Sequence, residues 1–243
     1  FISGGSEANN YALRGAFSAL RDRGNHIITS QVEHPAILET CRYLETQGAE
    51  VIYLAVDGVG RVDPDDVRKA ITEQTTLISI MHSNNEVGTV QPIAEIAEIA
   101  ANHNVLMHTD AAQSPGKVSL NVVDSGVNLL SLAGHKFGAP KGIGVLYIRR
   151  GVVLERLIHG ADHEVGRRAG TESALLIAAL GKAAEIAMAL SSVKSIRTLR
   201  DFFWEGLREI FGDRVLLNGD PIARLPNTLN VSFLDHQGAT VLQ

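Results

Sequence analysis

Cysteine is nearly absent from this sequence: Cys41 is the only one in 243 residues. A single cysteine excludes an internal disulfide, and this scarcity favours a reducing compartment, so we expect a cytoplasmic protein. An excess of basic residues is absent too. The net charge is −5, which argues against a nucleic-acid partner.

Long apolar runs and targeting signals are also lacking. The longest apolar candidate, residues 174–189, is interrupted by Gly181, Lys182 and Glu185, so we expect no membrane span. Residues 1–6 lack the basic start of a signal peptide. The chain does not begin with methionine, so we expect that it does not begin at a natural start. What remains, 45% hydrophobic and 20% charged residues, is typical of a globular protein.

Strand-like and helix-like segments alternate along the chain. Strands are expected at 26–30, 50–54, 76–81, 105–110, 127–133, 144–148 and 227–233, and helices at 6–24, 35–48, 63–73, 93–103, 172–190 and 195–211. This rhythm predicts an α/β fold, a mostly parallel sheet sandwiched by helices. We expect a large domain over residues 1–190 and the beginning of a smaller C-terminal α/β domain over residues 191–243.

Polar clusters follow three of the expected strands. Asn85 lies in one, Asp110 and Gln113 in the second, and His135 with Lys136 in the third. In an open parallel sheet, ligands bind beyond the carboxyl ends of the strands. These clusters are therefore expected to converge on one small molecule.

The cluster chemistry favours a phosphorylated pyridine cofactor. Gly5 and Ser6 precede a helix, where backbone N–H groups bind phosphate, although a glycine turn with a serine N-cap explains them equally well. A buried Asp110 needs a cation, and a pyridinium nitrogen fits; pyridoxal phosphate (PLP) also needs a lysine such as Lys136 for its Schiff base. The alternatives are an N-cap for Asp110 and a surface position for Lys136.

Three further side chains are candidates for the same cofactor. Asn85 and Gln113 could reach the phenolic oxygen of the ring, or they could be solvated loop residues. His34 could stack on the ring and exchange protons with the substrate, or it could simply lie near a helix start.

Taken together, six motifs in this order resemble the cysteine desulfurases, which are class V, fold-type I PLP enzymes. The motifs are SGGSEANN at 3–10, EH at 33–34, NNEVG at 84–88, HTDAAQ at 108–113, GHK at 134–136 and RAGTE at 168–172. The resemblance implies that Lys136 forms the covalent imine, that Asp110 pairs with the ring nitrogen, and that His34 stacks on the ring and moves protons. It also implies that Asn85 and Gln113 touch the phenolic oxygen or the substrate, and that Gly5, Ser6 and His135 bind the phosphate.

The resemblance also implies partners and a reaction. Thr171 would reach the phosphate of a neighbouring subunit in a homodimer. L-cysteine would give up its sulfur to an enzyme cysteine and leave L-alanine, and a sulfur-acceptor or scaffold protein would take the persulfide sulfur for iron–sulfur cluster or thio-cofactor biosynthesis. Cys41 lies on an expected helix and fits a structural role. The resemblance therefore implies that the catalytic cysteine and the carboxylate-binding arginine lie outside this chain, and we expect the chain to be an internal fragment of a longer protein.

Two departures from the family pattern and two rival functions accompany this reading. Ala133 stands where many relatives have a phosphate-binding serine, and residues 160–165 replace a more glycine-rich run. His159 and His163 lack a third ligand, so no metal site is expected. A selenocysteine lyase or another class V enzyme shares the cofactor motifs, whereas a non-catalytic binding paralogue is disfavoured because Lys136, Asp110 and His34 are all present.

Overall fold

The computed structural model describes residues 1–189, 193–234 and 236–241. Six strands form one sheet in the order β2-β1-β3-β4-β5-β6. These are β1 (His26–Ser30), β2 (Glu50–Leu54), β3 (Thr75–Ser79), β4 (Leu106–Asp110), β5 (Leu129–Ala133) and β6 (Gly144–Ile148). The first five pair in parallel and β6 pairs antiparallel with β5, so the mostly parallel α/β sheet is confirmed.

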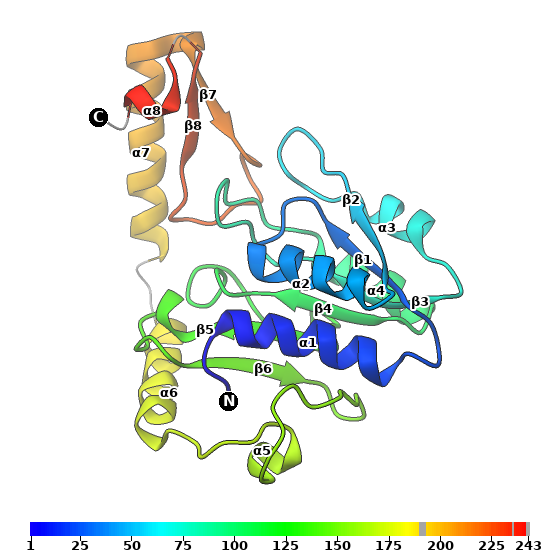
Figure 1. Ribbon diagram of the computed structural model, residues 1–243. Coiled ribbons are helices and arrows are strands. Elements are labelled where there is room, and N and C mark those ends of the chain that lie inside the picture. The colour runs from blue at the N-terminus through cyan, green and yellow to red at the C-terminus, as the bar shows by residue number, and fades with distance from the viewer. Residues whose placement is uncertain (190–192, 235, 242–243) are drawn as a thin grey trace.

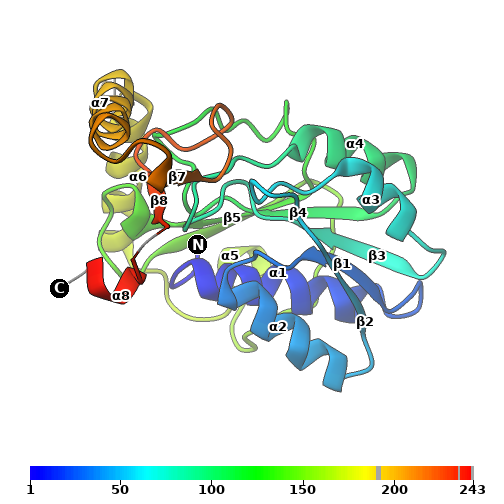
Figure 2. The same ribbon diagram turned by 90° about the horizontal axis from the view of Figure 1, so that it is seen from above.

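Helices cover both faces of this sheet, as the view from above shows (Figure 2). One face carries α1 (Gly5–Ala19) and α2 (Pro35–Thr46), and the other carries α3 (Pro64–Ala70) and α4 (Ile93–Asn102). Adjacent strand residues alternate between the two cores: Ile27 packs beneath α1 and α2, whereas Ile28 packs beneath α3 and α4. Strands buried on both faces account for their continuous apolar runs.

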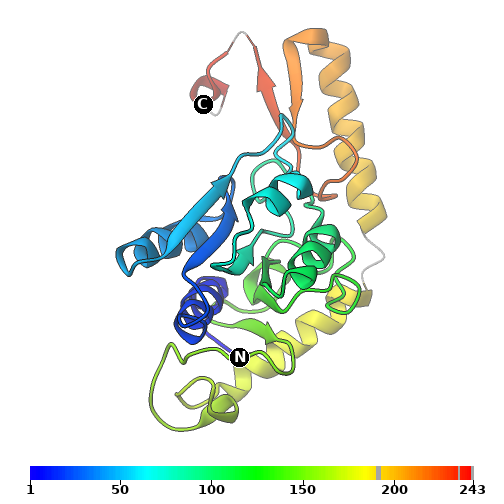
Figure 3. The same ribbon diagram turned by 90° about the vertical axis from the view of Figure 1, so that its right-hand side faces the viewer.

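A second, smaller sheet lies apart from the first (Figures 1 and 3). It pairs β7 (Val215–Asn218) antiparallel with β8 (Asn230–Phe233), beside the long helix α7 (Val193–Phe211). The expected strand at 227–233 is confirmed in its second half, and β7 was not predicted. The remaining elements are α5 (His163–Gly166), α6 (Ala174–Ala189), α8 (Gly238–Val241) and the 3-10 turns η1 (Gly134–Lys136) and η2 (Gly212–Arg214).

The expected domain boundary between residues 190 and 191 lies outside the described residues, as does the predicted end of the helix at Leu190. Among the residues that are described, no single helix is long and apolar enough to cross a membrane, although α6 and α7 pass that test together as a bent pair. No group of three or more His, Cys, Asp or Glu in the described chain could hold a metal ion.

Candidate active site

A cavity of about 510 Å³ opens at the carboxyl edge of the six-stranded sheet. It collects every predicted site residue except Thr171, namely Gly5, Ser6, His34, Asn85, Asp110, Gln113, His135 and Lys136. Each follows the end of a parallel strand or begins α1. The chain passes from β1 outward to β2 and then returns to β3 on the other side of β1, which is the type of switch point where α/β sheets bind ligands.

Asp110 closes the inner end of the cavity. It is 7% exposed, and burial raises the pKa of its carboxyl, while hydrogen bonds from Ala112 and Asn9 and the charges of His34 and Lys136 oppose that rise. The Ala112 N–H donates to Oδ1 at 2.9 Å, and Asn9 Nδ2 donates to Oδ2 at 2.6 Å. The capping alternative is wrong, because a turn rather than a helix follows.

Lys136 lines the same cavity, and its side chain is exposed. It ends η1 immediately after β5, and its exposed side chain follows the buried Gly134. A Cβ at Gly134 would lie 2.9 Å from Ile143 and Leu180, so only glycine lets the chain turn this closely against the helix α6. Lys136 is therefore exposed, as the alternative interpretation predicted. It nevertheless lines the cavity that Asp110 also lines.

The N-terminus of α1 forms a second wall. Gly4 is the N-cap residue and makes no side-chain cap, so the serine-cap alternative for Ser6 is wrong. A Cβ at Gly5 would lie 3.1 Å from the Cβ of Ala133, which brings the first turn of the helix against the end of β5. The N–H groups of a helix start favour an anion such as phosphate.

His34 is the N-cap of α2: the Ala36 N–H donates to its Nδ1 at 3.1 Å. β1 ends at Ser30, as predicted, and His34 follows it at the start of the next helix. The alternative interpretation, a histidine at a helix start, is thus confirmed. The same side chain also lines the cavity. Capping fixes the ring position and is compatible with a role in the site.

The two amide side chains are held by neighbours. Gln113 Oε1 accepts a hydrogen bond from Lys117 Nζ at 3.2 Å, and Asn85 Nδ2 donates to Glu86 Oε1 at 2.7 Å. Because Oε1 of Gln113 is engaged, its Nε2 is the donor that could meet a phenolic oxygen. Both residues line the cavity as expected.

Thr171 lies elsewhere, in a separate cavity of about 200 Å³ that Arg168 and Glu172 also line. Arg168 Nε donates to Glu7 Oε1 at 3.0 Å, and Tyr11 Oη donates to the Arg167 carbonyl at 2.6 Å. These contacts tie the segment before Thr171 to α1. The structure therefore does not bring Thr171 to the other predicted site residues of the same chain.

Two functional candidates escaped the sequence reading. Asn9 lies in a quoted motif, and its i, i+3 spacing from Ser6 could have indicated the cavity-facing side of α1. Glu33 is 5% exposed, accepts from Ser30 Oγ at 2.7 Å and from the Met81 N–H at 2.9 Å, and leaves Oε2 without a partner. Burial raises the pKa of Glu33 to about 8.

Cys41 lies on the buried face of α2 and is fully buried. Burial raises the pKa of its thiol to about 12, so the thiol is not a nucleophile near neutral pH.

A family model described as aminotransferase class V matches residues 1–243, which is the whole chain. The chain belongs to the aminotransferase class-V family. It is 48% identical over its full length to a cysteine desulfurase IscS from Dictyoglomus turgidum and 50% identical to one from Methanosarcina thermophila. It spans about 60% of the length of these curated relatives, 62% and 60% respectively.

Solved structures agree with the class-V assignment. A NifS-like protein superposes with a TM-score of 0.92 at 36% identity, covering 99% of this chain and 66% of its own. A structure described as SspA in complex with cysteine superposes with a TM-score of 0.85 at 39% identity, covering 96% of this chain and 65% of its own. The fold-type I architecture expected from the sequence is confirmed.

Class-V enzymes depend on PLP, and the residues of this cavity fit that cofactor. The buried Asp110 carboxylate has no cationic hydrogen-bond partner among the described residues, although its burial calls for one. A protonated pyridine nitrogen would supply that cation, the start of α1 would receive the phosphate, and Lys136 would supply the amine for the aldehyde. The cavity thus offers one group for each end of the molecule.

Proposed function

We propose that the protein containing this chain is a PLP-dependent cysteine desulfurase. It converts L-cysteine and an acceptor thiol into L-alanine and a persulfide. The observation that carries this proposal is the convergence of Asp110, His34 and Lys136 on one cavity in a class-V chain that is 48–50% identical to named cysteine desulfurases.

When bound, PLP supplies an electron-accepting ring that stabilises the electron pair left at an amino acid's Cα. Asp110 keeps the ring nitrogen protonated, since a buried carboxylate is stabilised by an adjacent positive charge. Lys136 Nζ would supply the amine for the cofactor aldehyde. His34, fixed at the start of α2, would contact the ring and move the substrate proton at an imidazole nitrogen.

The remaining cavity residues hold the cofactor. Gly5, Ser6 and His135 bind the phosphate, and Asn85 and Gln113 donate to the phenolic oxygen or to the substrate. Ala133 lines the cavity without a hydroxyl, so one phosphate contact is absent at that position. We propose these as binding roles.

The sulfur-accepting thiol is not Cys41, because that thiol is buried and its pKa is about 12. We place the accepting cysteine outside residues 1–243. The sulfur then passes to an acceptor or scaffold protein for iron–sulfur cluster or thio-cofactor biosynthesis, in the cytoplasm.

We further propose a homodimer with shared sites and two domains, residues 1–190 for PLP and residues 191–243 as the start of the smaller one. The position of Thr171 in a separate cavity supports this proposal. In such a dimer, Thr171 would contact the phosphate in the partner's site rather than in the site of its own subunit.

The test uses the whole protein, L-cysteine and a dithiol reductant. We expect sulfide and alanine in equal amounts, a visible absorbance that borohydride removes, and loss of both in Lys136→Ala. A protein that turns over selenocysteine but not cysteine would instead be a selenocysteine lyase. A colourless protein that binds no PLP would contradict the proposal.

A further inference from the structure

The loop after β3, residues 84–90, borders the cavity with Asn85 and Glu86. Asn84 organises the loop from within: its Oδ1 accepts from the Glu86 and Val87 N–H groups, its carbonyl accepts from the Gly88 N–H, and its own N–H donates to the Thr89 carbonyl. The loop lies beside the turn that joins β7 to β8, far along the chain (Figure 1).

Every residue from 86 to 90 is hydrogen-bonded to residues 220–230. The backbone contributes two bonds: Leu225 N–H donates to the Gly88 carbonyl at 2.8 Å, and Val90 N–H donates to the Ala223 carbonyl at 2.8 Å. Side chains contribute the others. Arg224 Nη2 donates to the Val87 carbonyl at 3.2 Å, Asn230 Nδ2 to the Glu86 carbonyl at 3.1 Å, and the Asp220 N–H to Thr89 Oγ1 at 3.0 Å.

Arg224 is the centre of this contact. It is only 5% exposed, and its Nη2 also lies 3.1 Å from the Thr228 carbonyl and 3.4 Å from the Asn218 carbonyl. One guanidinium thus joins both ends of the β7–β8 turn to the cavity loop. A buried arginine that donates to carbonyl oxygens of both the loop and the turn has a positioning role.

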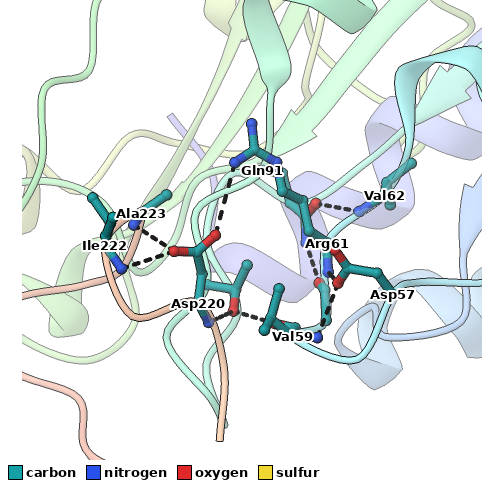
Figure 4. Close-up of polar contacts among 10 residues, drawn as sticks. Asp57, Val59, Arg61, Val62, Gln91, Asp220, Ile222 and Ala223 are labelled. Atoms are coloured by element: carbon teal, nitrogen blue, oxygen red, sulfur yellow. Dashed lines mark hydrogen bonds and ion pairs between the residues drawn. The ribbon is translucent and has the colours of Figure 1, made fainter.

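Asp220 extends the contact to a third segment (Figure 4). Its carboxylate accepts from the Ile222 and Ala223 N–H groups, both at 2.8 Å, and lies 3.8 Å from Arg61 Nη1. Arg61 belongs to the turn after β2, which Gln91 holds from the other side by donating to the Gly60 carbonyl at 2.7 Å. Hydrogen bonds and an ion pair therefore connect the turn, the cavity loop and residues 220–223.

Two glycines allow the backbones to approach. A Cβ at Gly219, where φ is +83°, would lie 2.5 Å from the Val87 carbonyl oxygen, and a Cβ at Gly88, where φ is +84°, would lie 2.9 Å from the Thr228 Cβ. Larger residues at either position would push the loop and the turn apart.

We propose that Gly219, Asp220 and Arg224 are positioning residues that hold the cavity loop in place. The segment between β7 and β8 thereby sets the affinity of the cavity for its cofactor. They act through Asn85, so the inference rests on the proposed function of that side chain. None of the three lines the cavity.

The test compares Gly219→Ala with Gly151→Ala in the whole protein. Gly151 has φ +90° and open space around its Cβ position, so both variants carry the same backbone strain and only Gly219→Ala displaces Val87. We expect Gly219→Ala alone to speed hydrogen exchange at the Val90 amide and to raise the PLP dissociation constant of the cofactor-free protein about five- to tenfold, the effect of one lost hydrogen bond.

A second pair covers the case in which Gly219→Ala does not fold. Arg224→Met is matched by Arg149→Met, since Arg149 likewise donates to backbone carbonyls, in its case the two of Val127 and Val122, away from the cavity. Equal exchange and equal PLP affinity within each pair would overturn the inference. If the wild-type protein bound no PLP, the proposed function itself would fail.

Discussion

At the scale of single residues, Asp110 is a position where burial and charge conflict. Its carboxyl is 7% exposed, and its two hydrogen bonds, from Asn9 and Ala112, come from neutral donors. Neutral donors offset only part of the cost of burying a charge. We therefore expect Asp110 to bind a cation that is not part of the protein chain.

Asp110→Asn removes the charge and keeps the shape. Asn9 Oδ1 is buried without a partner, so rotation of the Asn9 amide lets that oxygen accept from the new side chain, and the fold is retained. We expect exchange of the Cα proton of L-alanine in heavy water to slow about 10²- to 10³-fold, the usual cost of one electrostatic contact in an active site. Exchange at the wild-type rate would remove Asp110 from the mechanism.

Glu33 makes stability depend on pH. Burial raises the pKa of its carboxyl from 4.5 to about 8, so the folded protein holds a proton that the unfolded chain releases between those values. The free energy of unfolding contributed by this group is fully present below about pH 4.5 and is lost as pH rises through about 8.

We expect Glu33→Gln to remove that loss, because Gln Oε1 can still accept from Ser30 Oγ and from the Met81 N–H. Urea unfolding at pH 6 and at pH 8.5 measures this effect. The free energy of unfolding should fall more between the two pH values in the wild type than in Glu33→Gln. The difference between the two proteins isolates Glu33 from the histidines, which titrate in both. Parallel curves would show that Glu33 is ionised in the fold.

At the scale of elements, the start of α2 serves two purposes that substitution can separate. His34 caps the helix through Nδ1 and lines the cavity. Asparagine is among the best N-cap residues, whereas alanine is a poor one. Against wild type, His34→Ala should cost about 1 kcal/mol of stability, while His34→Asn should cost little.

Both variants should lose activity about 10²- to 10⁴-fold if the imidazole moves a proton. Thermal unfolding and L-cysteine turnover, measured on the same preparations, distinguish the two roles. Near-normal turnover in His34→Asn would leave only the capping role.

The elements that sequence reasoning predicted best are those where local signals agree. The strands at 26–30, 50–54 and 144–148 are confirmed at both ends, and the helix expected from residue 63 begins there, with Asp63 as the N-cap of α3 and Pro64 as its first residue. The strand β7 escaped prediction because its short apolar run, VLLN, has a partner only in β8, twelve or more residues later.

The candidate site follows the same logic. Residues at strand ends could be placed because parallel strands deliver their carboxyl ends to one edge. The Asn9–Asp110 hydrogen bond could not, since it joins positions 101 residues apart. Likewise, the contact of Arg224 with Val87 depends on how the β7–β8 turn packs against the loop after β3.

At the scale of the whole molecule, the two cavities divide the predicted site residues between them. Lys136 and Asp110 line one, and Thr171 lines the other with Arg168 and Glu172. The homodimer that we propose would account for this separation, because each subunit would then contribute its Thr171 to the partner's cofactor site.

Mixed dimers test the sharing directly. Lys136→Ala subunits lack the amine but carry Thr171, whereas Thr171→Ala subunits carry the amine but lack the hydroxyl. If sites are shared, a dimer of one of each has one complete site, so an equal mixture should recover about a quarter of the wild-type sites after subunit exchange. L-cysteine turnover at limiting PLP measures the recovery, with each variant alone as control. If Thr171 served its own subunit, the mixture would contain no complete site, and activity would not exceed the average of the separate variants.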